Sequence, residues 1–495
     1  MCLIVYACNK FRRYSVIMKT SSNQIKLKLL RFIILIFILV PFSLHSQTVT
    51  IKGKVMSGAD GKTIALYAYA DQLTYALTKI ASGTIDSTGK FSFSFKSENI
   101  FFAYLKIDFN QAPIFVEPGK TYDIIVKCPD CGAVDDHLNP YLYPKQLDVT
   151  LSGTDSTELN HLITSFNTMY EDFLWKNYVS LVKQRNKAKI DSFEVIVNSK
   201  FASYKNEYVS NLIRYRFGAL EQMGQIISVK KLAVKYFLKQ PVLYNNTGYM
   251  DFFNEFFNDY LPAESNGVTM DDLDRTINIE KSFPDLLDSL GKDSLLRNEV
   301  IREMVAMKTI ATLYYIKGLD KTSIIDMFNY VIANSKFPQH KIIAANYIKY
   351  LTKLTKGTAA PDFTLKDFTG LSYSLSEFNK GKYVFLFFWT TWSSASLAEM
   401  DLVSKLKEKY GTKVEFVGIC ADKEFMTYYY FMQKSKKYDF TTLHFGNNQD
   451  LLEAYEVKAY PAFVLIDPDG KIYQYPAEPP SGALDELLHD LTKIK

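Results

Sequence analysis

Three patterns of apolar and polar positions follow one another along the chain. Residues 47–153 alternate between apolar and polar side chains, as strands with one buried face do. Residues 154–356 repeat apolar side chains every three or four positions, which is typical of amphipathic helices. Residues 357–495 mix short, wholly apolar runs with amphipathic stretches, as buried strands and covering helices do. The chain is therefore multidomain: an N-terminal antiparallel β-sandwich, an all-α middle region and a C-terminal α/β domain.

Within these regions the same periods predict individual elements. Five strands are expected in the sandwich, separated by glycine-containing turns: 48–55, 63–70, 90–97, 101–108 and 121–128. In the middle region Asp155–Glu158 has the spacing of a capping box, and helices are expected over 158–184 and 297–319.

A linker is expected at 356–361, where the helical period ends. The apolar runs and amphipathic stretches that follow it predict alternating strands and helices. The expected elements are strands 383–388 and 413–420, helices 396–411, 425–438 and 483–494, and a hairpin over 461–475.

The head of the chain has the pattern of a secretory signal, which we place at 1–46. Lys26, Lys28 and Arg31 precede the apolar run 32–44, which is short for a bilayer span. Met18 is an alternative start, and an uncleaved anchor is the alternative to cleavage. We expect an exported protein of the periplasm or cell envelope, with membrane contact only through this segment if it is uncleaved.

Net charge adds little once this segment is set aside. The formal charge is +5 for the whole chain, but residues 1–46 hold seven basic and no acidic residues. The remainder is close to neutral, so nothing in its charge indicates nucleic-acid binding.

Several short motifs of the last region occur in a fixed order. They are Ala360–Leu365, Ser374–Phe378, Phe388–Trp392, Tyr460–Pro461 and Leu465–Ile472. In this order the region resembles the TlpA/ResA-like branch of the thioredoxin superfamily, close to the thiol-specific antioxidant (AhpC/TSA) group. The resemblance implies a mixed sheet with helices on both faces and a cis peptide bond before Pro461. The two earlier regions resemble those that precede such domains in exported envelope proteins.

The resemblance also implies two cysteines at the start of the helix after strand 383–388, and serine stands at both positions, Ser393 and Ser396. Disulfide exchange requires a thiolate, which a hydroxyl cannot replace. Serine does suit the first position as a helix N-cap. A serine nucleophile would need a base such as His444, which nothing in the spacing orients toward it. Asp401 replaces the proline of the family, which puts the helix kink in doubt.

Binding is the property that the resemblance leaves intact. In the family, the backbone before the cis proline pairs with substrate peptides as an added strand. We expect the corresponding surface here to consist of Trp389, Trp392, Tyr460 and Pro461. The alternative is that both tryptophans pack beneath the sheet.

The CxxC sequence of the chain is Cys128-Pro-Asp-Cys131. Three interpretations remain open: a disulfide that braces a loop, a redox-active pair, and half of a zinc site with His137 and Asp135 or Asp136. Cys420 ends an apolar run and is expected to be a small core residue.

Together these observations predict an exported protein with a redox-inactive thioredoxin-like domain that binds a peptide or protein partner non-covalently. We expect no cofactor, no metal and no nucleic acid. The alternative is an envelope thiol–disulfide oxidoreductase of the TlpA/ResA type that uses Cys128 and Cys131.

Overall fold

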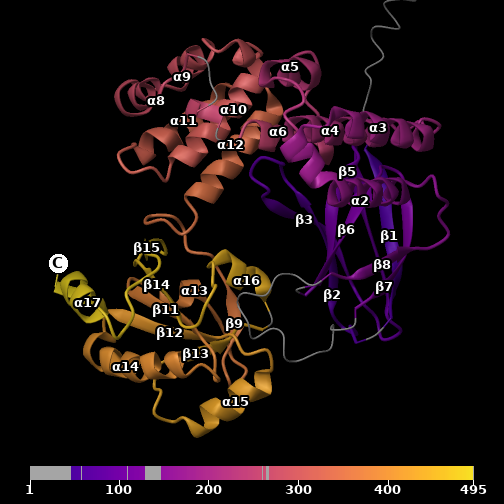
Figure 1. The fold of residues 1–495 in the computed structure, drawn as a ribbon. Helices are drawn as coiled ribbons and strands as arrows, with labels where there is room; N and C mark the ends of the chain where they lie inside the picture. Colours follow the sequence, from indigo (N-terminus) through magenta and orange to yellow (C-terminus); the bar gives the residue numbers. More distant parts are fainter. Residues whose placement is uncertain are drawn as a thin grey trace, which may run out of the picture. The chain divides into compact units, whose positions relative to one another are not determined.

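A computed structural model describes residues 46–56, 58–108, 110–128, 146–258, 260–263, 267–446 and 448–493 (Figure 1). Almost all of the expected signal sequence, including Met18 and the run 32–44, lies outside the described residues. Within the described ranges, none of the helices combines the length and apolar character needed to cross a membrane. Residues Thr48–Lys495 form one compact unit.

The first part of this unit consists of two four-stranded sheets. Their orders are β4-β1-β7-β8 and β3-β2-β5-β6. Apolar side chains from both sheets form one shared core, so the two sheets face each other as a sandwich. The strands are β1 Gln47–Val55, β2 Thr63–Tyr69, β3 Leu77–Thr84, β4 Lys90–Ser97, β5 Phe101–Ile107, β6 Asn110–Val116, β7 Thr121–Lys127 and β8 Asp148–Leu151.

Two features of the sandwich differ from the expectation. Strands β3, β6 and β8 were not predicted, and β3 has no buried face whose alternation could be recognised. The pair β1 and β7 is parallel, with Thr50 opposite Thr121 and Val55 opposite Val126. The expectation that all strand pairs of the sandwich are antiparallel is therefore wrong. Five strands separate β1 from β7 along the chain, so no hairpin imposes an antiparallel direction on this pair.

The middle region is helical, as expected. The α-helices are α2 Leu159–Gln184, α3 Lys187–Phe201, α4 Glu207–Met223, α5 Val229–Ala233, α6 Thr247–Phe256, α7 Tyr260–Ala263, α8 Met270–Asp274, α9 Phe283–Leu290, α10 Glu299–Leu313, α11 Lys321–Asn334 and α12 Pro338–Leu351. The expected capping box with Asp155 as the N-cap is wrong, because the N-cap of α2 is Glu158, three residues later. Asp155 accepts from the Thr157 amide at 2.8 Å, and Glu158 is itself the N-cap of α2, accepting from the His161 amide at 3.1 Å.

The C-terminal domain contains a seven-stranded sheet of order β10-β9-β13-β12-β11-β14-β15. Apolar clusters lie on both faces, and β11 is buried along almost its whole length. Elements β9, β10, β13, α13 and α16 were not predicted. The bounds are β9 Thr364–Lys366, β10 Ser372–Ser374, α13 Leu375–Phe378, β11 Tyr383–Trp389, α14 Ser394–Tyr410, β12 Val414–Cys420, α15 Phe425–Lys434, β13 Thr441–His444, α16 Gln449–Ala454, β14 Ala462–Ile466, β15 Ile472–Gln474 and α17 Leu484–Lys493.

The expected linker is part of this domain. The Gly357 amide donates to the Ile472 carbonyl, and the Ile472 amide donates to the Thr358 carbonyl, both at 2.8 Å. The Ala360 amide donates to the Gly470 carbonyl at 2.9 Å. Backbone hydrogen bonds therefore hold this segment against the edge of β15, and it is not a flexible connection.

Candidate functional site

The sheet brings three separate segments together beside the N-terminus of α14. Strand β11 lies inside the sheet, parallel to its neighbour β12 and antiparallel to its neighbour β14. Trp389 at the end of β11 lies opposite Cys420, and Phe388 lies opposite Ala462. The residues after β11, the residues after β12 and the residues before β14 therefore meet at one edge of the sheet, as expected where parallel strands end.

Ser393 forms the N-terminus of α14. Its extended backbone, with φ −85° and ψ 105°, makes it the N-cap, and its Oγ accepts from the Ser396 amide at 3.2 Å. The expected N-cap is confirmed. Ser396 lies almost completely buried in the first turn, and its own Oγ has no hydrogen-bond partner.

An aromatic pair, exposed Trp392 and half-buried Tyr460, lies beside this helix end. The Trp392 side chain is 49% exposed, and its ring meets the ring of Tyr460 edge-on, with 6.1 Å between centroids. The Tyr460–Pro461 peptide bond is cis, as the resemblance implies, and both residues are half-buried. Burial raises the pKa of the Tyr460 phenol, and nearby Cys420 and Asp422 raise it further. Tyr460 is therefore a neutral aromatic surface at ordinary pH.

Trp389 does not belong to this surface, and its inclusion was wrong. Its side chain is fully buried and packs against the rings of Tyr428 and Phe431 of α15, at 6.4 and 5.4 Å between centroids. Because Trp389 is still in β11, its side chain points into the core beneath the helices, whereas Trp392 follows the turn. The alternative of packing beneath the sheet therefore holds for Trp389 and fails for Trp392.

Asp422 is a buried carboxylate at this edge that the sequence analysis missed. Its side chain is 2% exposed, and Oδ1 accepts from the Thr391 amide at 3.1 Å. This bond fixes the turn between β11 and α14. The available signal was an acidic residue two positions after an apolar strand, where a buried charge needs a hydrogen-bond partner.

His444 is not arranged as a base for Ser393. Nδ1 accepts from the Gly446 amide at 3.1 Å, which leaves Nε2 as the donor to the Asp422 carbonyl at 2.6 Å. Burial lowers the pKa of His444. Both ring nitrogens of His444 and the Ser393 hydroxyl thus form hydrogen bonds with backbone groups. These bonds position the loops, and none of them joins His444 to Ser393 as a base is joined to a nucleophile.

The cysteines fall into two environments. Cys420 is free and completely buried, and burial raises the pKa of its thiol, as expected of a core residue. Cys128 follows β7, is buried and is disulfide-bonded. Cys131, Asp135, Asp136 and His137 lie outside the described residues, so the interpretation as half of a zinc site is not tested. In the part of the chain that the structure describes, no cluster of His, Cys, Asp or Glu is placed to hold a metal.

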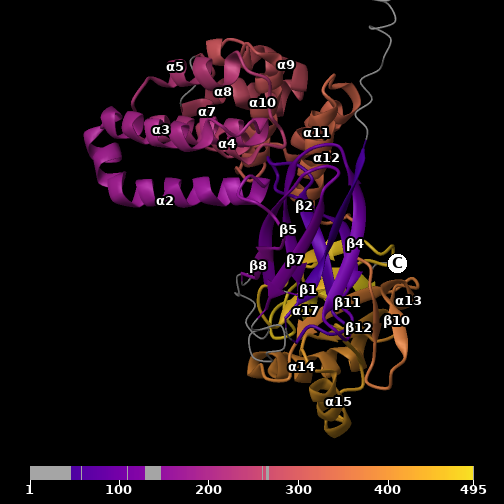
Figure 2. The same cartoon turned by 90° about the vertical axis from the view of Figure 1, so that its right-hand side faces the viewer.

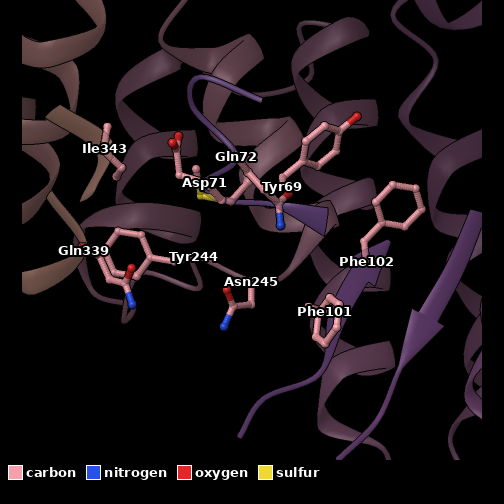
Figure 3. Close-up of a pocket in the computed structure, with 11 residues that line it drawn as sticks. Tyr69, Asp71, Gln72, Phe101, Phe102, Tyr244, Asn245, Gln339 and Ile343 are labelled. Atoms are coloured by element: carbon pink, nitrogen blue, oxygen red, sulfur yellow. The ribbon is translucent and has the colours of Figure 1, made fainter. Parts of the chain in front are cut away.

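A further cavity lies between the sandwich and the helical region (Figure 3). Tyr69, Gln72 and Phe102 line it from the sandwich, and Tyr244 and Ile343 from the helices. Its volume of about 30 Å³ accommodates one or two water molecules and excludes a substrate.

The Tyr244 phenol at this cavity begins a buried polar chain. It bonds Nε2 of His340 at 2.8 Å, and His340 Nδ1 bonds Glu303 Oε1 at 2.8 Å. His340 is fully buried. Because the cavity has no room for a substrate, these groups stabilise the helical core.

A mixed sheet in which a buried interior strand leads into a helix, opposite a cis proline, defines the class of thioredoxin-like domains. The chain belongs to the AhpC/TSA family, whose model matches residues 356–475. Residues 49–159 match a domain of unknown function (DUF4369).

Curated relatives match the C-terminal domain. The thiol-disulfide oxidoreductase ResA of Bacillus thuringiensis subsp. konkukian is 34% identical over 152 residues, which are 30% of this chain and 86% of that protein. ResA of Bacillus subtilis is 30% identical over 143 residues, or 28% of this chain and 76% of that protein. Among solved structures, a putative thiol-disulfide oxidoreductase from Bacteroides vulgatus is 29% identical, with a TM-score of 0.26 over 28% of this chain and 93% of that one.

Proposed function

We propose that this chain is an exported envelope protein whose thioredoxin-like domain binds a peptide or protein partner without exchanging disulfides. The observation that supports the proposal most strongly is the composition of the turn at α14. Ser393 and Ser396 occupy its start, so the first turn offers hydroxyls and backbone amides and no thiol. Relatives named thiol-disulfide oxidoreductases make an extracytoplasmic location the natural expectation, together with the pattern at 1–46.

The binding surface that we propose consists of Trp392, Tyr460 and Pro461. An exposed aromatic ring that stands edge-on to a second ring presents a rigid apolar contact, of the type enriched at binding hot spots. Strand β14 begins at Ala462, directly after the cis proline. A partner peptide would pair with this backbone as an added strand and place an apolar side chain against Trp392.

Loss of exchange and gain of binding are tested separately. In an insulin-reduction assay with dithiothreitol, the mature protein is expected to accelerate precipitation no more than its Cys128→Ser variant does. Acceleration that Cys128→Ser abolishes would instead establish the alternative, an oxidoreductase that uses Cys128 and Cys131.

Binding is tested by selecting from a displayed library of random dodecapeptides. Peptides enriched on the mature protein are expected to be lost on Trp392→Ala and on Tyr460→Ala. The matched control is Tyr430→Ala, which removes an aromatic side chain of 55% exposure from α15 of the same domain. Equal loss with the control, or no enrichment at all, would contradict the proposed surface.

A further inference from the structure

Helix α2 carries an exposed apolar stripe that no element of the described chain covers. Trp175 is 89% exposed, and Tyr178, Val179 and Val182 are also exposed. Spacings of three, one and three residues place all four on one face of the helix. The opposite face is used: Phe173 stacks on Phe193 of α3 with 4.2 Å between ring centroids. By residue number the stripe lies in the C-terminal half of α2, and Figure 2 shows the turn that leads from this end of α2 into α3.

Charges of opposite sign flank the two ends of the stripe. Glu171 and Asp172 come before it, and Lys183 and Arg185 come after it. All four side chains are exposed. Within the chain, Asp172 forms an exposed ion pair with Lys176 at 3.5 Å, and Arg185 donates to Gln225. Such exposed contacts contribute little and leave these charges available to a partner.

We propose that this stripe is the contact between two copies of the chain, whose α2 helices pack antiparallel about a two-fold axis between Tyr178 and Val179. In an isologous contact, residues at equal distances from the axis come opposite each other. Trp175 then packs against Val182 of the partner subunit, at about 5 Å along the helix from the axis. Tyr178 and Val179 flank the axis, so Tyr178 meets Val179 of the partner subunit.

The flanking charges select this arrangement. In the antiparallel pair, Asp172 lies opposite Arg185 of the partner subunit, and Glu171 and Lys183 of the partner subunit each lie within one helical turn of this pair. A parallel pair would place acid against acid and base against base, which is unfavourable. A membrane is a poorer match, because an anionic lipid surface that attracts Lys183 and Arg185 repels Glu171 and Asp172 at the other end of the stripe.

The size of the stripe limits the strength of the contact. Covering four such side chains on each copy buries on the order of 1,000 Å², the lower end for specific interfaces. The dimer is therefore weak and depends on protein concentration.

Two charge-reversed variants test the proposal. Glu171→Lys with Asp172→Lys makes one variant, and Lys183→Glu with Arg185→Glu makes the other. In sedimentation velocity, the wild type is expected to shift from monomer to dimer with concentration, and each variant alone is expected to stay monomeric. An equimolar mixture of the two variants is expected to recover the dimer, since each acid again meets a base.

The control is Tyr350→Asp, which changes an exposed side chain on α12 and is expected to leave dimerisation unchanged. Monomer at every wild-type concentration would overturn the proposal, as would a mixture that fails to associate. A monomeric wild type that binds phosphatidylglycerol vesicles through Trp175 would overturn it in favour of a membrane contact. Recovery in the mixture also shows that both variants are folded.

Discussion

Two identical substitutions three residues apart on α14 are expected to change stability in opposite directions. Ser393→Ala removes the N-cap that accepts from the Ser396 amide, which costs about 1 kcal/mol. Ser396→Ala removes a hydroxyl that is 1% exposed and has no partner. Removing an unsatisfied buried hydroxyl is expected to raise the free energy of unfolding by about 1 kcal/mol. The higher helix propensity of alanine adds about 0.3 kcal/mol. The two variants should therefore differ by about 2 kcal/mol in their free energy of unfolding.

Urea unfolding followed by tryptophan fluorescence measures this difference. The chain has three tryptophans, so a Trp175→Phe background leaves only Trp389 and Trp392, both in the C-terminal domain. Ser394→Ala, at an exposed position in the same turn, is the control and is expected to change stability by less than about 0.5 kcal/mol. Equal shifts for Ser393→Ala and Ser396→Ala would refute the assignment of Ser393 as the cap and of Ser396 as an unsatisfied group.

Three further predictions concern other parts of the protein. Iodoacetamide is expected to label Cys420 only after unfolding, because burial raises its pKa and denies access; labelling in the native state, read by peptide mass, would contradict this. The lowered pKa of His444 means that the unfolded chain binds its proton more readily. Neutral His444 therefore contributes to stability above about pH 6.5, the pKa of an unfolded histidine, and this contribution is lost as the pH falls toward the lower pKa of the folded state. The variant His444→Asn should therefore show a smaller decrease of Tm below about pH 6.5 than the wild type does. His340→Ala leaves the Glu303 carboxylate buried without its imidazole and is expected to cost about 3 kcal/mol, against about 1 kcal/mol for Tyr244→Phe; equal losses in thermal unfolding would refute the proposed polar chain.

The elements that the sequence predicted best are those with one strong physical signal. Strand β11 is a wholly apolar run, and it is an interior strand of the sheet, covered on both faces. Ser393 was recognisable as an N-cap because serine precedes an amphipathic stretch. The short strands β9, β10 and β13 carry no such signal, since three or four residues are too few to show a period.

The candidate site was harder to predict, because a residue before the turn at the end of β11 is buried, whereas one after that turn is exposed. Trp389 and Trp392 differ by three positions and look alike in the sequence, yet one ends a buried strand and the other is exposed. Asp422 becomes important only because the sheet brings the end of β12 beside the turn after β11. Such proximity is set by strand order, which local patterns do not encode.

The most direct test of the central claim is a redox titration of the mature protein in glutathione buffers, in which alkylation and intact mass report the state of Cys128 and Cys131. A redox-inactive binding protein predicts a structural disulfide with a midpoint below about −300 mV. A midpoint between about −120 and −270 mV, where exchange proteins operate, would contradict the claim and place an active centre beside the sandwich.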